Sequence, residues 1–235
     1  DWLMAHELFG GPFRELPFAL LADDETPLFD HAAELVAGDL EVMERLVRTL
    51  VLAGFGTATI GNSQPASQGE HLISHYIDMF ADAARPLIFH GEQVGVTTLS
   101  MVRLQERMLG ERPTIRADIS TEAEFKARYG EELGASCWAE FAQKRMTAEK
   151  AEQLNDLLAD RWPAIRDRVR SVLLTTERLT QVLKAAGADL TPDAIHLPRG
   201  FYETALLRCR EIRNRYTFLD LAAGAGKLAG LVSEL

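Results

Sequence analysis

The stretch GNSQPASQGEHLISHYIDM, residues 61–79, joins a loop rich in helix breakers to an apolar helix that carries two histidines. Glycine, asparagine and proline at its start end one helix, and Ser67 or Gln68 can open the next. His71 and His75 are four residues apart, so both project from one helix face, about 6 Å from each other along the axis. They are either part of a metal or catalytic site or simply two histidines within a helix.

A helical spacing of apolar residues recurs along almost the whole chain, and almost no segment alternates as a strand does. Asp39 is a suitable N-cap for a helix over residues 40–60, and we expect Pro86 to close the histidine helix. Further helices are expected at 90–109, 120–130, 131–145, 147–186 with a break near Pro163, 198–216, and from 218 onward. We therefore predict a single all-α domain over residues 1–235, with about ten helices joined by short loops.

The composition is that of a globular protein, with 235 residues of which 47% are hydrophobic and 26% charged. The net charge of −10 argues against nucleic-acid binding, because phosphate contacts need clustered lysine and arginine. Cys137 and Cys209 stand alone, which excludes a disulfide framework and a cysteine-based zinc cluster and fits a reducing compartment. No apolar run approaches the roughly 18–20 residues of a membrane span, so we predict a cytoplasmic protein without membrane insertion.

The chain contains no recognisable nucleotide-binding motif. It has no strand–glycine–helix unit and no G-x-G-x-x-G. The stretch GAGKLAG (224–230) looks like a phosphate loop, but Leu221 occupies the place of the first glycine and Leu228 replaces the serine or threonine. We expect this stretch to serve helix packing or capping.

A third histidine, His90, opens the segment HGEQVGVTT after a proline break. Neutral imidazole binds zinc or ferrous iron through one ring nitrogen, so the three histidines could serve one ion, or one ion and its substrate. The pattern is not H-E-x-x-H, since the acid, Glu70, precedes the pair. On spacing alone, a metal site and an ordinary helix remain equally open.

Longer motifs around these histidines resemble a known family. SQPASQGEHLISHYIDM followed by HGEQVGV is similar to the polyol dehydrogenase and dehydroquinate synthase superfamily. Within it, the closest pattern is that of the sn-glycerol-1-phosphate dehydrogenase branch, S-R-P-A-S-G-x-E-H…S-H…H-G-E-Q. CREIRNRYTFLDLAAGAGKL resembles that branch's I-R-x-R-Y-T-x-L-D-L, and the opening DWLMAHE is also similar. The resemblance extends over the whole chain but covers only the family's helical C-terminal domain.

The resemblance implies a metal site in a cleft between two domains. Family members place a dinucleotide-binding α/β domain before the all-α domain and hold one divalent ion, usually zinc, with an acidic residue and two histidines. By motif the two histidine ligands are His71 and His90, while His75 is the catalytic residue beside the substrate and Gln64 is a further substrate-side residue. The family's acidic ligand lies shortly upstream of the D-W motif. We therefore expect this chain to be the C-terminal part of a longer protein, lacking the acidic ligand and the dinucleotide domain.

The implied reaction is the NAD(P)H-linked reduction of dihydroxyacetone phosphate to sn-glycerol 1-phosphate. A zinc ion, or another divalent ion such as Fe²⁺ or Ni²⁺, would polarise the ketone while the nicotinamide delivers hydride. His75 or a bound water would supply the proton that the developing alkoxide needs. Because the acidic ligand is missing, we expect this chain alone to bind zinc weakly and to have no dehydrogenase activity.

Two departures from the family pattern concern the substrate. Gln64 stands where the branch has arginine, and Gln68 stands where it has glycine. Arginine clamps phosphate with a bidentate geometry that glutamine cannot match. Either the phosphate is held elsewhere, for instance by a residue of the missing domain, or the substrate is not that phosphate. Arg213 and Arg215 are distant in sequence, and we expect structural roles for both.

Two other functions remain open. The first is a sibling enzyme on the same scaffold, either a glycerol or polyol dehydrogenase or a dehydroquinate synthase-like lyase. The second is a helical interaction module in which the histidines are relics of lost catalysis. If the chain is part of an enzyme, its binding partner is a small phosphorylated triose or polyol. We also expect a homo-oligomer, although no stretch of the sequence identifies an interface.

Overall fold

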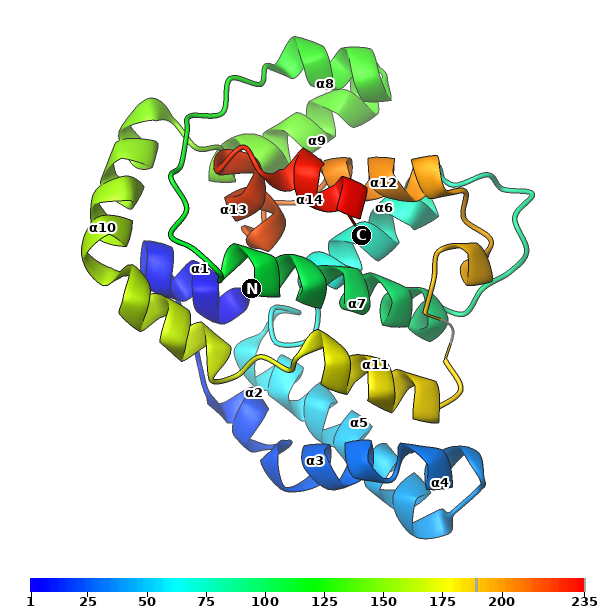
Figure 1. Cartoon of the computed structure of the whole chain (residues 1–235). Helices are drawn as coiled ribbons and strands as arrows, with labels where there is room; N and C mark the ends of the chain where they lie inside the picture. Colours follow the sequence, from blue (N-terminus) through cyan, green and yellow to red (C-terminus); the bar gives the residue numbers. More distant parts are fainter. Residues whose placement is uncertain (189, 235) are drawn as a thin grey trace.

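The computed structural model describes residues 1–188 and 190–234, and within these ranges all regular secondary structure is helical (Figure 1). The predicted all-α class is thereby confirmed. The elements are α1 (Trp2–Phe9), α2 (Leu16–Ala19), α3 (Ala22–Asp30), α4 (Ala32–Val36), α5 (Leu40–Ile60), α6 (Gly69–Phe80), α7 (His90–Met108), α8 (Glu122–Tyr129), α9 (Glu131–Lys144), α10 (Ala148–Arg170), α11 (Thr176–Ala185), η1 (Asp193–Ile195), α12 (Arg199–Arg208), η2 (Cys209–Glu211), α13 (Phe218–Gly224) and α14 (Leu228–Glu234).

Helix α7 runs through the middle of the molecule and packs against α6, α11 and α13 (Figure 1). One large apolar core joins the buried faces of α1, α6, α7, α9, α10, α12 and α13. Its fully buried members include Ile73 and Ile77 of α6, Leu104 of α7, and Phe218 of α13. The helix that carries two histidines is therefore anchored by its apolar face, which leaves its other face available for a site.

Helix α5 begins and ends as the sequence predicts. The side chain of Asp39 accepts hydrogen bonds from the backbone N–H groups of Glu41 (2.9 Å) and Val42 (3.1 Å), as an N-cap does. The helix ends at Gly61, whose φ of 75° lies in the left-handed region that favours glycine.

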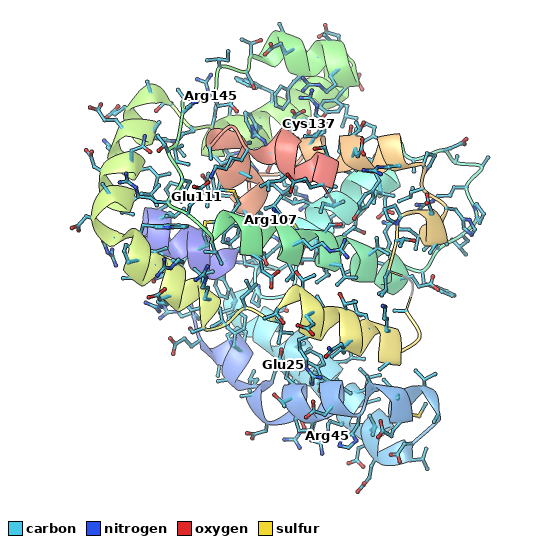
Figure 2. All side chains as sticks on the ribbon, in the orientation of Figure 1. Glu25, Arg45, Arg107, Glu111, Cys137 and Arg145 are labelled. Carbon is cyan, nitrogen blue, oxygen red and sulfur yellow. The ribbon has the colours of Figure 1, made fainter. Side chains whose placement is uncertain are left out.

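Helices α2 to α5 form the lower end of the molecule in Figure 1 and are thinly packed. Although α5 contacts α2, α3 and α4, only Val42 and Gly56 among its residues are buried. Arg45, labelled in Figure 2, and Arg48 of α5 both pair with the buried carboxylate of Asp24 on α3. Ion pairs thus contribute to a region that lacks a large apolar core of its own.

Asp1 connects three segments that are far apart in the sequence. One of its carboxylate oxygens accepts a hydrogen bond from the backbone N–H of Gly69 (3.0 Å), and the other accepts one from Phe218 (2.8 Å). Gly69 and Phe218 are the first residues of α6 and α13, whose N–H groups have no partner within the helix. The carboxylate therefore holds the N-terminal ends of these two helices together.

Proline does not break α10, contrary to the expectation from the sequence. The helix continues from Ala148 to Arg170 with Pro163 inside it. A proline within a helix removes one backbone hydrogen bond and costs about 3 kcal/mol. Here Leu158, Trp162 and Ile165 are buried on either side of it in the main core, and this packing outweighs the local cost.

Other helix ends also differ from the predicted ones: the segment predicted to run to residue 186 ends at Arg170 before a separate α11, and the one predicted from residue 218 onward is divided into α13 and α14. Helix α6 stops at Phe80 rather than at Pro86, because the side chain of Asp82 accepts a hydrogen bond from Ala84 N (2.9 Å) and forms a turn there. The helix expected over 198–216 stops at Arg208, followed by η2 and an irregular connection over 212–217. That connection brings Arg213 and Arg215 back toward α6, as described below.

The two cysteines are free in the structure, as the sequence predicts. Cys137, labelled on α9 in Figure 2, and Cys209 are both buried and unpaired. Burial raises the pKa of both thiols, which keeps them protonated and unreactive at neutral pH. Among the described residues, no helix combines the length and the apolar character needed to cross a membrane.

The contact between α8 and α9 depends on the absence of a side chain at Gly134. An added Cβ would lie 2.5 Å from the Cα of Lys126 and 2.6 Å from the carbonyl oxygen of Phe125. We expect Gly134→Ala to lower the free energy of unfolding by about 2 kcal/mol or more, as overpacking against backbone does. Gly95→Ala on α7 is the matched control, since nothing lies within 4 Å of its Cβ position. In urea unfolding, Gly95→Ala should leave the free energy of unfolding unchanged or raise it by up to about 1 kcal/mol. Equal effects of the two substitutions would contradict the prediction.

Candidate metal and substrate site

The three histidines singled out in the sequence lie together where α6 packs against α7. His71 and His75 come from α6, and His90 is the first residue of α7. The ring centres of His71 and His90 are 5.2 Å apart, while His75 lies 6.1 Å from His71 and 6.4 Å from His90. His71 and His75 are half-buried and His90 is exposed, so the cluster is open to solvent.

His71 is held in place by the carboxylate of Glu70. The Nδ1 atom of His71 lies 2.8 Å from Oε1 of Glu70, and the same oxygen accepts a hydrogen bond from Gln68 N. Burial alone would raise the pKa of Glu70, but the hydrogen bonds from His71 and the backbone bring it below its ordinary value. Glu70 is therefore ionised at neutral pH and keeps the proton of His71 on Nδ1. A metal-binding histidine commonly has such a carboxylate behind it.

His90 is supported by a buried polar network. Its Nδ1 atom lies 3.4 Å from Oγ of Ser74, a fully buried residue of α6. The amide nitrogen of Gln93 lies 2.8 Å from the same Oγ and 2.9 Å from Oδ1 of Asp78. Arg85 donates to Oε1 of Gln93 (3.0 Å). Gln93 therefore links α7 to α6 directly behind His90. The sequence analysis did not predict this role, although Gln93 is part of the HGEQ motif.

His71 and His90 are the two histidines whose spacing could suit a shared divalent ion. Two imidazoles bound to one tetrahedral zinc have ring centres roughly 5 Å apart, close to the 5.2 Å observed. Because Nδ1 of each ring faces a polar partner, Nε2 remains available for an ion. In the described ranges, however, no group of three or more histidine, cysteine or acidic side chains is arranged to hold a metal ion. Among the described residues, His71 and His90 are thus a pair that could hold an ion only together with ligands from elsewhere.

His75 is the histidine whose electrostatic surroundings are most distinctive. Its pKa lies below the ordinary value, firstly because of burial and secondly because of the positive charge of Arg213. His71 and His90 lower the pKa further, and Asp78 opposes them. The ring of His75 is therefore mainly neutral at pH 7. The nearness of Arg213 was not foreseen from the sequence, because well over a hundred residues separate the two.

The loop before α6 carries both substituted positions. Gln68 occupies the N-cap position of α6, and its side chain donates to the carbonyl oxygen of Gln64 (2.6 Å). Arg215 donates to the carbonyl oxygen of Ser67 and to Oγ of Ser63 (3.2 Å). Arg215 thus fixes this loop against the C-terminal part of the chain, which is the structural role expected for it.

Known proteins similar to this chain share one name. No family model matches the chain. Glycerol-1-phosphate dehydrogenase (NAD(P)+) of Methanosphaera stadtmanae is 36% identical over 105 residues, which cover 45% of this chain and 29% of the relative. The enzyme of that name from Pyrococcus horikoshii is 36% identical over 104 residues, covering 44% and 29%. Over part of its length the chain is thus similar in sequence to glycerol-1-phosphate dehydrogenases.

This homology confirms the resemblance found in the sequence motifs. A third relative with this name, from Geobacillus thermodenitrificans, is 21% identical over 224 residues, which cover 93% of this chain and 48% of the relative. The chain therefore spans less than half the length of these curated relatives.

The network behind His90 gives a stability prediction. We expect Gln93→Leu to lower the free energy of unfolding by about 2–3 kcal/mol, because it leaves the buried carbonyl oxygen and Oγ of Ser74 without their partner. Gln181→Leu on the exposed face of α11 is the matched control and should change it by less than about 0.5 kcal/mol. Urea unfolding monitored by circular dichroism measures both, and a Gln93→Leu protein as stable as its control would refute the role of the network.

Proposed function

We propose that this chain is the helical metal and substrate domain of an enzyme that reduces dihydroxyacetone phosphate to sn-glycerol 1-phosphate with NAD(P)H. The observation that carries the proposal is the convergence of His71, His75 and His90 in a chain homologous to glycerol-1-phosphate dehydrogenases. NAD(P)H would be bound by a dinucleotide-binding domain outside this chain, which also would provide the acidic metal ligand. The enzyme would act in the cytoplasm as a longer polypeptide.

His71 and His90 would hold the divalent ion, with zinc as the first candidate and Fe²⁺ or Ni²⁺ as alternatives. Such an ion, when bound, polarises the ketone oxygen of the substrate and so makes its carbon a better acceptor of hydride. Glu70 keeps the His71 ring oriented, and Ser74 with Gln93 does the same for His90. This support keeps both nitrogen ligands in place without rearrangement when the substrate binds.

His75 would supply the proton that the reduction consumes. Its half-exposed ring lies beside both metal-binding histidines, so it can donate a ring proton to the alkoxide oxygen and regain one from solvent. Its lowered pKa also suits the reverse direction, in which a neutral imidazole removes the proton of the alcohol. Gln64 would donate a hydrogen bond from its amide to the substrate.

A second candidate function is favoured by Gln64 itself. An uncharged amide at this position is compatible with an unphosphorylated polyol, so a glycerol or polyol dehydrogenase on the same scaffold is the alternative. Substrate profiling of the longer protein separates the two candidates. Activity with free glycerol but none with dihydroxyacetone phosphate would remove the leading proposal.

The ligand roles give a direct experiment. In the longer protein, we expect His71→Ala and His90→Ala each to lower bound zinc and to reduce turnover by about 100-fold or more. His31→Ala, at an exposed position whose ring contacts only Glu34 among the hydrogen-bonding groups, is the control and should change neither. Zinc content by mass spectrometry and NADH oxidation are the measurements. Unchanged zinc and turnover in both variants would show that these two histidines neither hold the ion nor serve the reaction.

We also propose that the chain self-associates through one face of α5. Six apolar side chains on this face remain 44–78% exposed, namely Leu40, Met43, Val47, Leu50, Val51 and Phe55. Their spacing follows the seam of a helix pair. An antiparallel pairing about Val47 would place Met43 opposite Val51 and Leu40 opposite Gly54, next to Phe55, so the face can pack against a second copy of itself. Two copies would bury on the order of 1,200 Å², the lower limit for a stable interface.

A charge at the centre of this face tests the pairing. We expect Val47→Glu to convert the self-associated protein to a monomer in analytical ultracentrifugation, because the pairing would desolvate two like charges. Val172→Glu, in the exposed turn after α10, is the matched control and should leave the oligomeric state unchanged. If Val47→Glu keeps the oligomer of the parent protein, the face serves a different contact, such as one with the dinucleotide-binding domain.

A further inference from the structure

A large cavity lies outside the histidine cluster. Its volume is about 950 Å³, which is within the range of small-molecule sites, and His71, His75 and His90 are not among the residues that line it. Its walls come from the end of α1, the end of α9, one face of α10 and the irregular connection over 212–217. Figure 1 shows α1 beside α10, and the two helices are in contact. The function proposed above makes no use of this cavity.

One part of the cavity lining is apolar. Leu8 of α1 and Leu154 of α10 are buried in the main core, and Leu157 is partly buried against the same core. The rings of Phe9 and Tyr216 also line the cavity and pack edge to face, with their centres 4.7 Å apart. Phe9 nevertheless remains 46% exposed. Apolar surface of this kind gains free energy when the hydrocarbon part of a ligand covers it.

The charged part of the lining is mainly positive. It contains the four cations Lys144, Lys150, Arg161 and Arg168 and, among the described residues, a single acid, Glu7. The carboxylate of Glu7 is shared by two guanidiniums, 2.9 Å from Arg168 and 3.6 Å from Arg161. Lys150 forms no ion pair within residues 1–188 and 190–234. In a protein of net charge −10, this cavity therefore attracts anions.

Helix α10 presents the apolar and the charged groups on one face. Lys150, Leu154, Leu157 and Arg161 follow one another at intervals of four, three and four residues, which places them in one row along the helix. Lys150 and Arg161 are about 16 Å apart along the helix axis, with the two leucines between them. An extended ligand on this face meets both kinds of group at once.

We propose that this cavity is a second ligand site, which binds a small organic anion with an extended apolar body, such as a medium-chain carboxylate. The leucines of α10 and the ring of Phe9 cover the hydrocarbon chain, and Lys150 and Arg161 bind the acid group. An inorganic anion leaves the apolar lining uncovered, and a neutral hydrocarbon leaves the cations without a partner. The combination of the two parts therefore determines which ligand is selected.

Calorimetric titration with decanoate tests this site in the longer protein and in the present chain. We expect one molecule of decanoate to bind to each. Decanol lacks the charge and acetate lacks the chain, so each should bind at least about 10-fold more weakly than decanoate. The measurement is of binding alone, and its result does not depend on whether the longer protein is a dehydrogenase.

Substitution of the two cations locates the binding. We expect the double variant Lys150→Gln with Arg161→Gln to raise the Kd of decanoate by about 10-fold or more, the effect of losing hydrogen bonds to a charged group. Both residues are exposed, so the fold should be retained. The double variant Lys184→Gln with Arg166→Gln is the matched control. It removes the same two charges outside the cavity and should bind decanoate as the parent does.

Three results would overturn the proposal. The first is an equal Kd of decanoate for the two double variants, and the second is binding of decanol as tight as that of decanoate. The third is binding of decanoate by the present chain but not by the longer protein. In that case a segment of the longer protein covers the cavity, which is then a contact within the protein and no ligand site.

Discussion

The carboxylate of Asp1 bonds to the first turns of both α6 and α13, and the candidate site depends on this connection. Helix N-termini carry unsatisfied N–H groups and a partial positive charge, so one carboxylate can stabilise two of them when they converge. Helix α6 carries His71 and His75, and α13 packs against α7, which begins with His90. An electrostatic contact between segments far apart in the sequence thus helps to position the helices that bring the histidines together.

Around the histidines, the polar groups divide into two kinds. Glu70, Ser74 and Gln93 lie behind the rings, are buried or half-buried, and determine which ring nitrogen faces outward. Arg213, whose charge lowers the pKa of His75, is exposed and forms no hydrogen bond or ion pair among the described residues. Buried polar groups are costly unless hydrogen-bonded, so the first kind supports the geometry. An exposed cation has no such requirement and can exchange water for a ligand.

Much of the fold was predictable because its signals are local. The Asp39 cap, the Gly61 stop and the start of α7 at His90 all follow from residues adjacent to the helix ends. The continuous α10 was not predictable in this way. The sequence shows the local cost of Pro163 within a helix, but the packing of Trp162 and Ile165 that outweighs this cost is formed only in the tertiary structure. The early end of the helix after Arg208 was missed as well, and with it the path of the chain past Arg213.

The sequence by itself determined the helical class, the identity of the three histidines and the homology to glycerol-1-phosphate dehydrogenases, because periodicity and motif spacing are properties of the chain alone. Only the tertiary structure decided that the three rings lie within 5.2–6.4 Å of one another, and that Glu70 and Gln93 orient two of them. It also brought the charge of Arg213 near enough to His75 to lower the pKa of that ring, second to burial. Contacts between residues so far apart in sequence arise from the packing of helices against a common core, and no local pattern encodes them.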